Sequence, residues 1–322
     1  MRGVIVKQKR IDEMTNDIVI FAKDRINRPK DKFSNKTQDI LQESEYDKNC
    51  PFCRGNEQLT PKHTYKVEDA NGWITKSTLN KFPIIDTVSK DIYGLHEVMI
   101  DTYRHDGNFY NMTKDEFIEL IKMYKNRYQE FVKDENIEYV SIFKNYLNRA
   151  GASLIHPHSQ IISLPFIPPD IDKEVSIARD YYDKNKECMY TKLIEKEIEY
   201  KERVVYNGEK IIAIVPYATR YSGEVRIIMK EKIKFENISQ KHIEEISDLL
   251  LKLFKKIEIT RGKVPFNLYI HNYPKDIESL EYYNVHFHIV PRVFNLGGFE
   301  LSTGIYSTSL IPEEYAQKLK VD

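Results

Sequence analysis

The chain has few cysteines, no excess of charge of either sign and no long apolar run. Three cysteines in 322 residues are too few for a disulfide framework. Lys plus Arg and Asp plus Glu number 49 each, so no overall field favours nucleic acid or an anionic membrane as a partner. The N-terminus lacks the apolar core of a signal peptide, and no run of about 18 apolar residues is available to span a bilayer. We therefore expect a soluble, cytoplasmic protein.

The length leaves room for two domains, and the two halves of the chain resemble each other. Each half has two strand-like segments, an amphipathic helix and two further strand-like segments. Three pairs of landmarks keep an offset of 126 to 130 residues: Glu97 and Glu224, Thr113 and Ser239, and His156 and His286. A nearly constant offset over several landmarks favours duplication of one structural unit.

The repeated unit predicts an α+β fold with two tandem domains, each a mainly antiparallel sheet packed with helices. Thr113 and Glu116 form a capping box before one apolar stripe, and a second stripe follows Ser239. Both stripes indicate core packing. No long Pro, Gly or Ser linker separates the halves. We place the boundary in the polar segment DKNKECMYTK, giving domains 1–187 and 188–322.

The segment HPHSQ is the most informative part of the chain. On a strand, His156, His158 and Gln160 would face the same side. An imidazole in such a row can attack phosphorus, which points to nucleotidyl chemistry. Cys50 and Cys53 have CxxC spacing and can bind one Zn²⁺ through thiolates, although two local ligands also fit a chance pair of packed thiols.

A set of motifs in fixed order resembles the galactose-1-phosphate uridylyltransferases, a branch of the histidine-triad superfamily. The motifs are CPFCRGNEQLTP, NKFP, GLHEVMIDTYRH, FKN followed by GAS and HPHSQ, HFHIVPR, and GGFELSTGIY. The resemblance implies that His105 and His156 complete a tetrahedral zinc site with the two cysteines. A site with four protein ligands is structural, so the metal would act by fixing the strand that presents His158.

The resemblance also implies that His158 is the nucleophile. A largely neutral imidazole attacks the α-phosphorus of a nucleotide sugar, giving a uridylyl-histidine and a hexose 1-phosphate, and a second hexose 1-phosphate then reverses the step in ping-pong fashion. Gln160 would donate to the phosphoryl oxygens, with further donors from Ser153 and the backbone around Gly151. A carboxamide cannot shuttle a proton, which favours transfer over hydrolysis. The alternative for His158 is a hydrogen-bonded core histidine.

The second half repeats the row imperfectly, with Val290 where the first half has Gln160, so it makes a poor second active site. The resemblance instead implies a second metal, iron or zinc. Its ligands would be Glu174, His271, His286 and His288. A hydrogen-bonded histidine cluster is the alternative.

The remaining site residues come from the resemblance. Arg25 and Arg28 match paired arginines suited to the phosphate of a hexose 1-phosphate, although such arginines are commonly solvated. Asn80 and Asn145 match positions near the nucleotide and its phosphates. In the segment GGFE, which otherwise indicates only a turn, Phe299 and Glu300 match a sugar-facing pair. The resemblance further implies a homodimer.

Two departures concern the substrate. Ser159 replaces a glycine common in the galactose enzymes, and Tyr306 stands where they usually have glutamine. Both resemble the ADP-glucose phosphorylase-like branch. The first hypothesis is therefore a UDP-glucose–hexose-1-phosphate uridylyltransferase, and the alternatives are a nucleotide-sugar phosphorylase that uses phosphate as acceptor and a non-catalytic nucleotide-binding relative.

Overall fold

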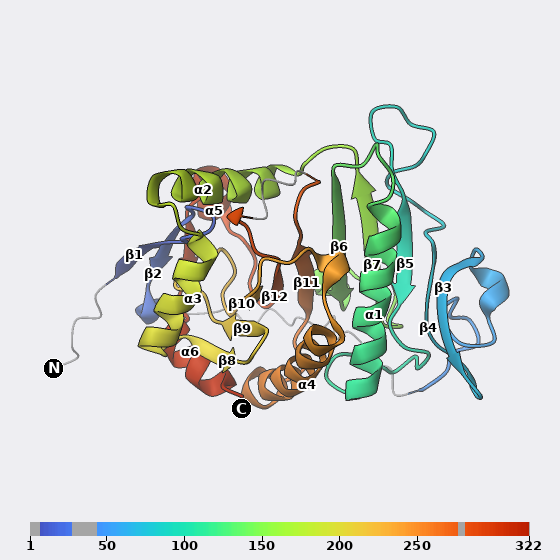
Figure 1. The fold of residues 1–322 in the computed structure, drawn as a ribbon. Coiled ribbons are helices and arrows are strands. Elements are labelled where there is room, and N and C mark those ends of the chain that lie inside the picture. The colour runs from blue at the N-terminus through green and yellow to red at the C-terminus, as the bar shows by residue number, and fades with distance from the viewer. Residues whose placement is uncertain (1–6, 28–43, 276–280, 322) are drawn as a thin grey trace.

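The computed structural model describes residues 7–27, 44–275 and 281–321. Within these residues the chain forms one large sheet of ten strands, in which all neighbouring pairs are antiparallel, and one small sheet (Figure 1). In spatial order the large sheet consists of β3 (His63–Asp69), β4 (Gly72–Leu79), β5 (His96–Ile100), β7 (His158–Leu164), β6 (Tyr139–Tyr146), β11 (Phe266–His271), β12 (His286–Pro291), β10 (Val225–Met229), β9 (Ile211–Ile214) and β8 (Val204–Asn207).

The two halves of the large sheet have matching strand orders. In each half, read inward from the edge, three strands follow in chain order and the last two are exchanged. From one edge the order runs β3, β4, β5, β7, β6, and from the other β8, β9, β10, β12, β11. The two halves meet where β6 pairs with β11, with Asn145 opposite Asn267. The α+β class with a mainly antiparallel sheet is confirmed. The matched order supports the proposed duplication, and the boundary at residue 187 stays a prediction.

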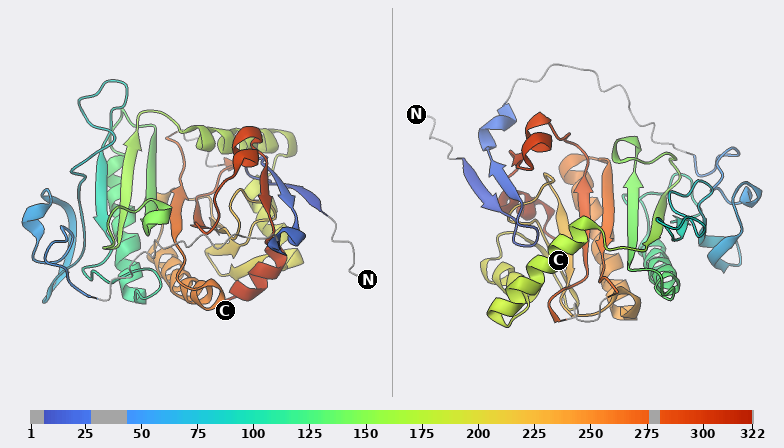
Figure 2. Two further views of the ribbon diagram at one scale, coloured as in Figure 1. Left: turned by 180° about the vertical axis from the view of Figure 1, so that it is seen from behind. Right: turned by 90° about the horizontal axis from the view of Figure 1, so that it is seen from above.

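Two long helices cover one face of the large sheet, one over each half (Figures 1 and 2). They are α1 (Lys114–Phe131) and α4 (Gln240–Arg261). The predicted capping box is present, since Thr113 Oγ1 accepts from the Glu116 amide at 3.2 Å and Glu116 Oε2 accepts from the Thr113 amide at 2.8 Å. The apolar stripes predicted from the sequence are buried, as Phe117 and Leu250 show. These helices form the core with the sheet.

The remaining elements of the described residues are a small sheet, four further helices and four 3₁₀ turns. The small sheet has the order β1 (Gln8–Ile11), β2 (Ile18–Phe21), β13 (Tyr306–Thr308). The further helices are α2 (Pro169–Asn185), α3 (Met189–Tyr200), α5 (Gly298–Thr303) and α6 (Pro312–Leu319), with 3₁₀ turns η1 (Lys23–Asn27), η2 (Glu57–Leu59), η3 (Asn148–Ala150) and η4 (Phe235–Asn237). Buried ion pairs such as Arg226 with Asp12 join the N-terminal segment to the second half. No helix of the described residues could cross a membrane.

The register of the large sheet places the functional side chains on the face away from α1 and α4. Residues directly opposite each other share a face. Gln160 pairs with Phe143, which pairs with Tyr269, which pairs with His288. One row across four strands therefore joins the two histidine-bearing segments, and alternation puts His158 and His286 on the same face.

Candidate active site and metal centres

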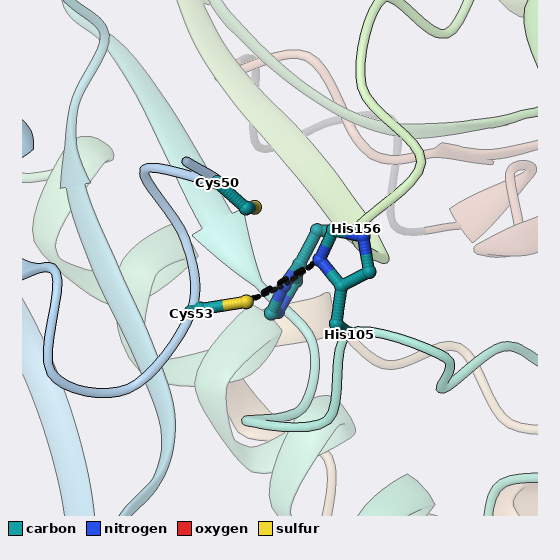
Figure 3. A group of neighbouring side chains, drawn as sticks. All are labelled: Cys50, Cys53, His105 and His156. Atoms are coloured by element: carbon teal, nitrogen blue, oxygen red, sulfur yellow. Dashed lines mark hydrogen bonds between the residues drawn. The ribbon is translucent and has the colours of Figure 1, made fainter. Parts of the chain in front are cut away.

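Cys50, Cys53, His105 and His156 lie together beside the first half of the large sheet. Figure 3 shows Cys53 pointing at the two imidazoles, with Cys50 on the same loop. Cys53 Sγ is 3.3 Å from His105 Nδ1 and 3.6 Å from His156 Nδ1, and the two Nδ1 atoms are 3.3 Å apart. One ligand atom from each of the four residues lies within 4.8 Å of the others. The four residues predicted from the sequence are thus brought together.

The surroundings of this cluster suit a metal ion. His156 Nε2 lies 2.9 Å from the Thr102 carbonyl oxygen, so it carries the proton and donates, which leaves Nδ1 as a ligand. The amide of Asp47 donates to Cys53 Sγ. Burial raises the pKa of the Cys50 thiol to about 12 and lowers the pKa of His156 to about 3, so this pocket favours neutral groups unless a cation compensates the thiolates. Two sulfur and two nitrogen donors fit a soft or borderline divalent cation.

His158 begins strand β7, while His156 precedes it. The expectation that both histidines lie on one strand is therefore wrong by two residues, because Pro157 between them has no N–H for the ladder. His158 Nδ1 lies 2.8 Å from the carbonyl oxygen of His156 and must donate to it, so the lone pair is on Nε2. Burial lowers the pKa of His158, which keeps the imidazole neutral.

Gln160 follows on the same face, with its carboxamide held by a histidine that sequence analysis missed. His96 Nε2 lies 2.8 Å from Gln160 Oε1. The amide nitrogen of Asn80 lies 3.0 Å from His96 Nε2, so this predicted site residue belongs to the same cluster. A signal for His96 existed in the sequence, because it lies in the motif GLHEVMIDTYRH, but no role followed from its residue type alone.

Asn145 lies on the neighbouring strand β6. Lys144 pairs with Ser159, so the register continued by one residue places Asn145 opposite His158. Its Oδ1 accepts from Asn267 Nδ2 at 2.7 Å. Gly151 has a φ of +93°, a conformation that favours glycine, and ends the turn η3, while Ser153 is exposed in the loop that leads to His156. Asn145 therefore borders His158, and its Nδ2 lies 3.5 Å from the Gly151 carbonyl oxygen, while the role of Ser153 stays a prediction.

The second predicted metal cluster is also assembled. Glu174 on α2 places Oε2 2.9 Å from His271 Nδ1 and 3.4 Å from His286 Nε2. One ligand atom from each of Glu174, His271, His286 and His288 lies within 4.8 Å of the others. The Nε2 atom of His288 is buried without a hydrogen-bond partner, and that of His286 has only the 3.4 Å contact with Glu174. Their Nδ1 atoms are 2.6 Å from Glu224 Oε1 and 2.8 Å from the Asn284 carbonyl, respectively. Two imidazoles held in this way have lone pairs available for a cation.

Arg25, Phe299 and Glu300 form a separate group. They line a pocket of about 520 Å³ between η1, α5 and the small sheet. Figures 1 and 2 show α5 and β2 at one end of the molecule and β7 well away from them. Read alone, the segment GGFE indicates a turn, but in the structure it forms the start of helix α5. There Glu300 Oε2 accepts a hydrogen bond from the Gly297 amide at 2.9 Å. The structure therefore does not bring these residues to His158 within one chain, and Arg28 lies outside the described residues.

Ser159 and Tyr306, the two residues that differ from those common in the galactose enzymes, have structural roles. Ser159 is fully buried and points toward α1, on the face opposite to His158. Tyr306 is half-buried on β13, paired with Val19 and packed against the small cluster that contains Phe21. Within one chain the Ser159 hydroxyl takes part in buried hydrogen bonds, and Tyr306 packs against the small cluster.

The large antiparallel sheet, with His158 and Gln160 on one face of β7, agrees with an enzyme of the nucleotidyltransferase class. The chain belongs to the galactose-1-phosphate uridyl transferase family, since the family model described as "Galactose-1-phosphate uridyl transferase, N-terminal domain" matches residues 2–168. A second model, described as "Domain of unknown function (DUF4921)", matches residues 104–321.

Individual relatives agree with this family. An ADP-glucose phosphorylase of Arabidopsis thaliana is 27% identical over 97% of this chain and 92% of the relative. A galactose-1-phosphate uridylyltransferase of Thermotoga maritima is 26% identical over 84% and 88%. The solved structure of an ADP-glucose phosphorylase from Arabidopsis thaliana with bound ADP-glucose matches with a TM-score of 0.86 and 27% identity, covering 98% of this chain and 99% of that one. The predicted resemblance is confirmed.

Proposed function

We propose that the protein is a UDP-glucose–hexose-1-phosphate uridylyltransferase that works through a covalent uridylyl group on His158. The observation that carries the proposal is the fixed tautomer of His158. Because Nδ1–H donates to the His156 carbonyl, Nε2 presents a lone pair on the face that also carries Gln160.

The reaction takes place in two displacements. His158 Nε2 attacks the α-phosphorus, an N–P bond forms, and the bond from that phosphorus to the bridging oxygen breaks, so hexose 1-phosphate leaves with the electron pair. A phosphate oxygen of a second hexose 1-phosphate then attacks the same phosphorus, and the imidazole recovers its lone pair. The leaving group is a phosphate, which needs no strong acid, and the role of Gln160 is to donate hydrogen bonds to the phosphoryl oxygens.

We further propose that the Cys50 cluster holds Zn²⁺ and that the Glu174 cluster holds iron or zinc. Four protein ligands leave no open position at the first site, so the cation there would hold His156, and through it the start of β7, in place. The phosphoryl steps would therefore depend on the cation at the Cys50 cluster only through the position of His158.

A phosphorylase reaction is the second candidate. It is supported by the 27% identity and TM-score of 0.86 to the solved structure that contains ADP-glucose. In this reaction inorganic phosphate replaces hexose 1-phosphate as the attacking group, and adenylyl replaces uridylyl on His158. The covalent step is common to both candidates.

One labelling experiment tests both candidates. The protein is incubated with UDP-glucose or ADP-glucose labelled with ³²P at the α-phosphorus, and the protein-bound label is then challenged with galactose 1-phosphate or inorganic phosphate. The first candidate predicts label from UDP-glucose that galactose 1-phosphate removes. Label from ADP-glucose that phosphate removes favours the phosphorylase. His158→Ala must abolish labelling, and a wild-type protein that takes no label from any nucleotide sugar refutes both.

We propose that a second copy of the chain completes the active site, as a homodimer. The supporting observation is that Arg25 and Glu300 line a pocket remote from His158 of their own chain. Mixing two inactive variants, His158→Ala and Arg25→Ala, under conditions that exchange subunits then restores activity, because one of the two sites receives both intact residues. No recovery in hybrid dimers isolated through a different affinity tag on each variant contradicts the proposal.

A further inference from the structure

His96 lies beside Gln160 and Asn80 in the candidate active site. It lies on β5, opposite Ile162 of β7, and Val98 two residues later lies opposite Gln160. His96 and Gln160 are therefore diagonal neighbours on the same face of the sheet. The His96 side chain is buried, with an exposed fraction of 5%.

The hydrogen bonds around the ring fix its tautomer. The backbone N–H of Ile84 donates to His96 Nδ1 at 3.3 Å, so Nδ1 is an acceptor. The proton is therefore on Nε2, which donates to Gln160 Oε1 at 2.8 Å. Asn80 follows β4, and its backbone N–H donates to the His96 carbonyl at 2.8 Å while its Oδ1 accepts from the Phe82 amide at 2.9 Å. Its Nδ2 lies 3.3 Å from His96 Nδ1 and 3.0 Å from Nε2, so the Ile84 contact alone selects between the two ring nitrogens.

A carboxamide has two ends of opposite character, and only one of them suits an anion. With its oxygen held by His96, Gln160 presents its NH₂ group to the space beside His158. If the amide turned over, its oxygen lone pairs would face the phosphoryl oxygens and repel them. Nothing in glutamine itself selects between the two orientations, so the selection must come from its neighbours.

We infer that His96 is a positioning residue, which orients the Gln160 amide so that Gln160 can act only as a donor to the transferred phosphoryl group. The inference rests on the proposed function for its catalytic consequence. Its structural content, an Nε2–H tautomer bonded to Gln160, stands apart from any turnover. Ile84 belongs to the same arrangement because its N–H determines which ring nitrogen accepts and which one donates.

The catalytic test is a double-mutant cycle between His96 and Gln160. His96→Phe keeps a planar ring but loses the donor, and we expect the rates of labelling and of discharge to fall about tenfold or more, with nucleotide-sugar affinity nearly unchanged, as for loss of one aligned oxyanion donor. In the Gln160→Ala background the same substitution should change the rates little. His96→Gln, whose amide can also donate to Gln160, should recover part of the rate. Val98→Ala, a truncation on the same strand, is the control for packing.

The structural test is ¹⁵N NMR of histidine-labelled protein, with the side-chain amide of Gln160 assigned by comparison with Gln160→Ala. We expect His96 to be protonated at Nε2 and His96→Phe to shift the Gln160 amide signals, whereas Val98→Ala should shift them less. A proton on Nδ1, or equal rate losses with and without Gln160, overturns the inference. If the wild-type protein takes up no label from any nucleotide sugar, the proposed function is refuted. In that case the NMR measurement is the only test of whether His96 orients Gln160.

Discussion

The hydroxyl of Ser159 donates a hydrogen bond to Asp101 Oδ1 at 2.8 Å, behind the strand that carries His158. Asp101 also forms a fully buried ion pair with Lys144, whose Nζ is 2.6 Å from Asp101 Oδ2. The same Nζ donates to the His158 carbonyl at 3.1 Å, and Tyr124 of α1 contacts Ser159. Ser159, which the sequence indicated as a residue that affects substrate choice, is thus part of a buried network. This network includes the hydrogen bond from Lys144 to the backbone carbonyl of His158.

The position of Ser159 predicts an effect on stability and none on nucleotide choice. Ser159→Ala leaves Asp101 without one donor and Tyr124 without its partner, so we expect a loss of about 1–3 kcal/mol in the free energy of unfolding. The ratio of labelling by UDP-glucose to labelling by ADP-glucose should not change. Urea denaturation followed by circular dichroism measures the first quantity. Ser153→Ala, at an exposed position, should leave stability unaltered, and a changed nucleotide ratio in Ser159→Ala would contradict the assignment.

Lys144 should contribute far more to stability than an exposed lysine. Its side chain is 1% exposed and its partner Asp101 is fully buried, so Lys144→Met leaves a buried carboxylate unpaired at a cost of about 3–5 kcal/mol. Lys133→Met is the matched control, because Lys133 is 67% exposed in its pair with Glu130, and exposed pairs contribute about 0–1 kcal/mol. Denaturation midpoints of the two variants should differ accordingly. Adding Asp101→Asn to Lys144→Met should recover stability, and further loss would argue against the pair.

The sequence was sufficient for features that depend on local periodicity or on ordered motifs. Alternation placed His158 and Gln160 on one face, helical spacing located α1 and α4, and the motif set identified both groups of residues that could hold a metal. Each of these depends on residues whose type alone restricts their chemistry. The buried partners were different, because Lys144 and Asp101 look like ordinary surface charges until the register of β5, β6 and β7 brings them together.

Long-range geometry also decided the points where sequence reasoning failed. Pro157 moved His156 off the strand and into the metal cluster, a change of direction that alternation alone does not reveal. His96 acquired a role only through a diagonal contact across two strands. Arg25 and Glu300 line another pocket within a single chain, so their place in one site with His158 stays a prediction that depends on a second copy of the chain.

Cysteine substitutions should separate the predicted zinc site from ordinary packing. Cys50→Ala removes one of four ligands, and we expect purified protein to lose about one equivalent of zinc, measured by mass spectrometry of the metal, because sites lacking a ligand bind zinc much more weakly. Cys188 is also buried, but its Sγ lies 3.5 Å from Asn284 Oδ1, outside both clusters. Cys188→Ala should therefore keep the zinc content of the wild type. Equal zinc content in all three proteins would show that Cys50 is not a ligand.

Glu174 provides the corresponding test for the second cluster. Burial raises the pKa of its carboxyl, but His271 and His286 outweigh burial and hold that pKa well below its usual value, so Glu174 is ionised and can bind a cation. Glu174→Gln keeps the size but removes the charge, and we expect loss of the second equivalent of metal while zinc at the Cys50 cluster remains. Tyr283→Phe is the control, because it removes only the hydroxyl that donates to Glu174 Oε2 at 3.1 Å. If the wild type and Glu174→Gln both contain one equivalent, the buried Nε2 atoms of His286 and His288 belong to a hydrogen-bonded cluster and not to a metal site.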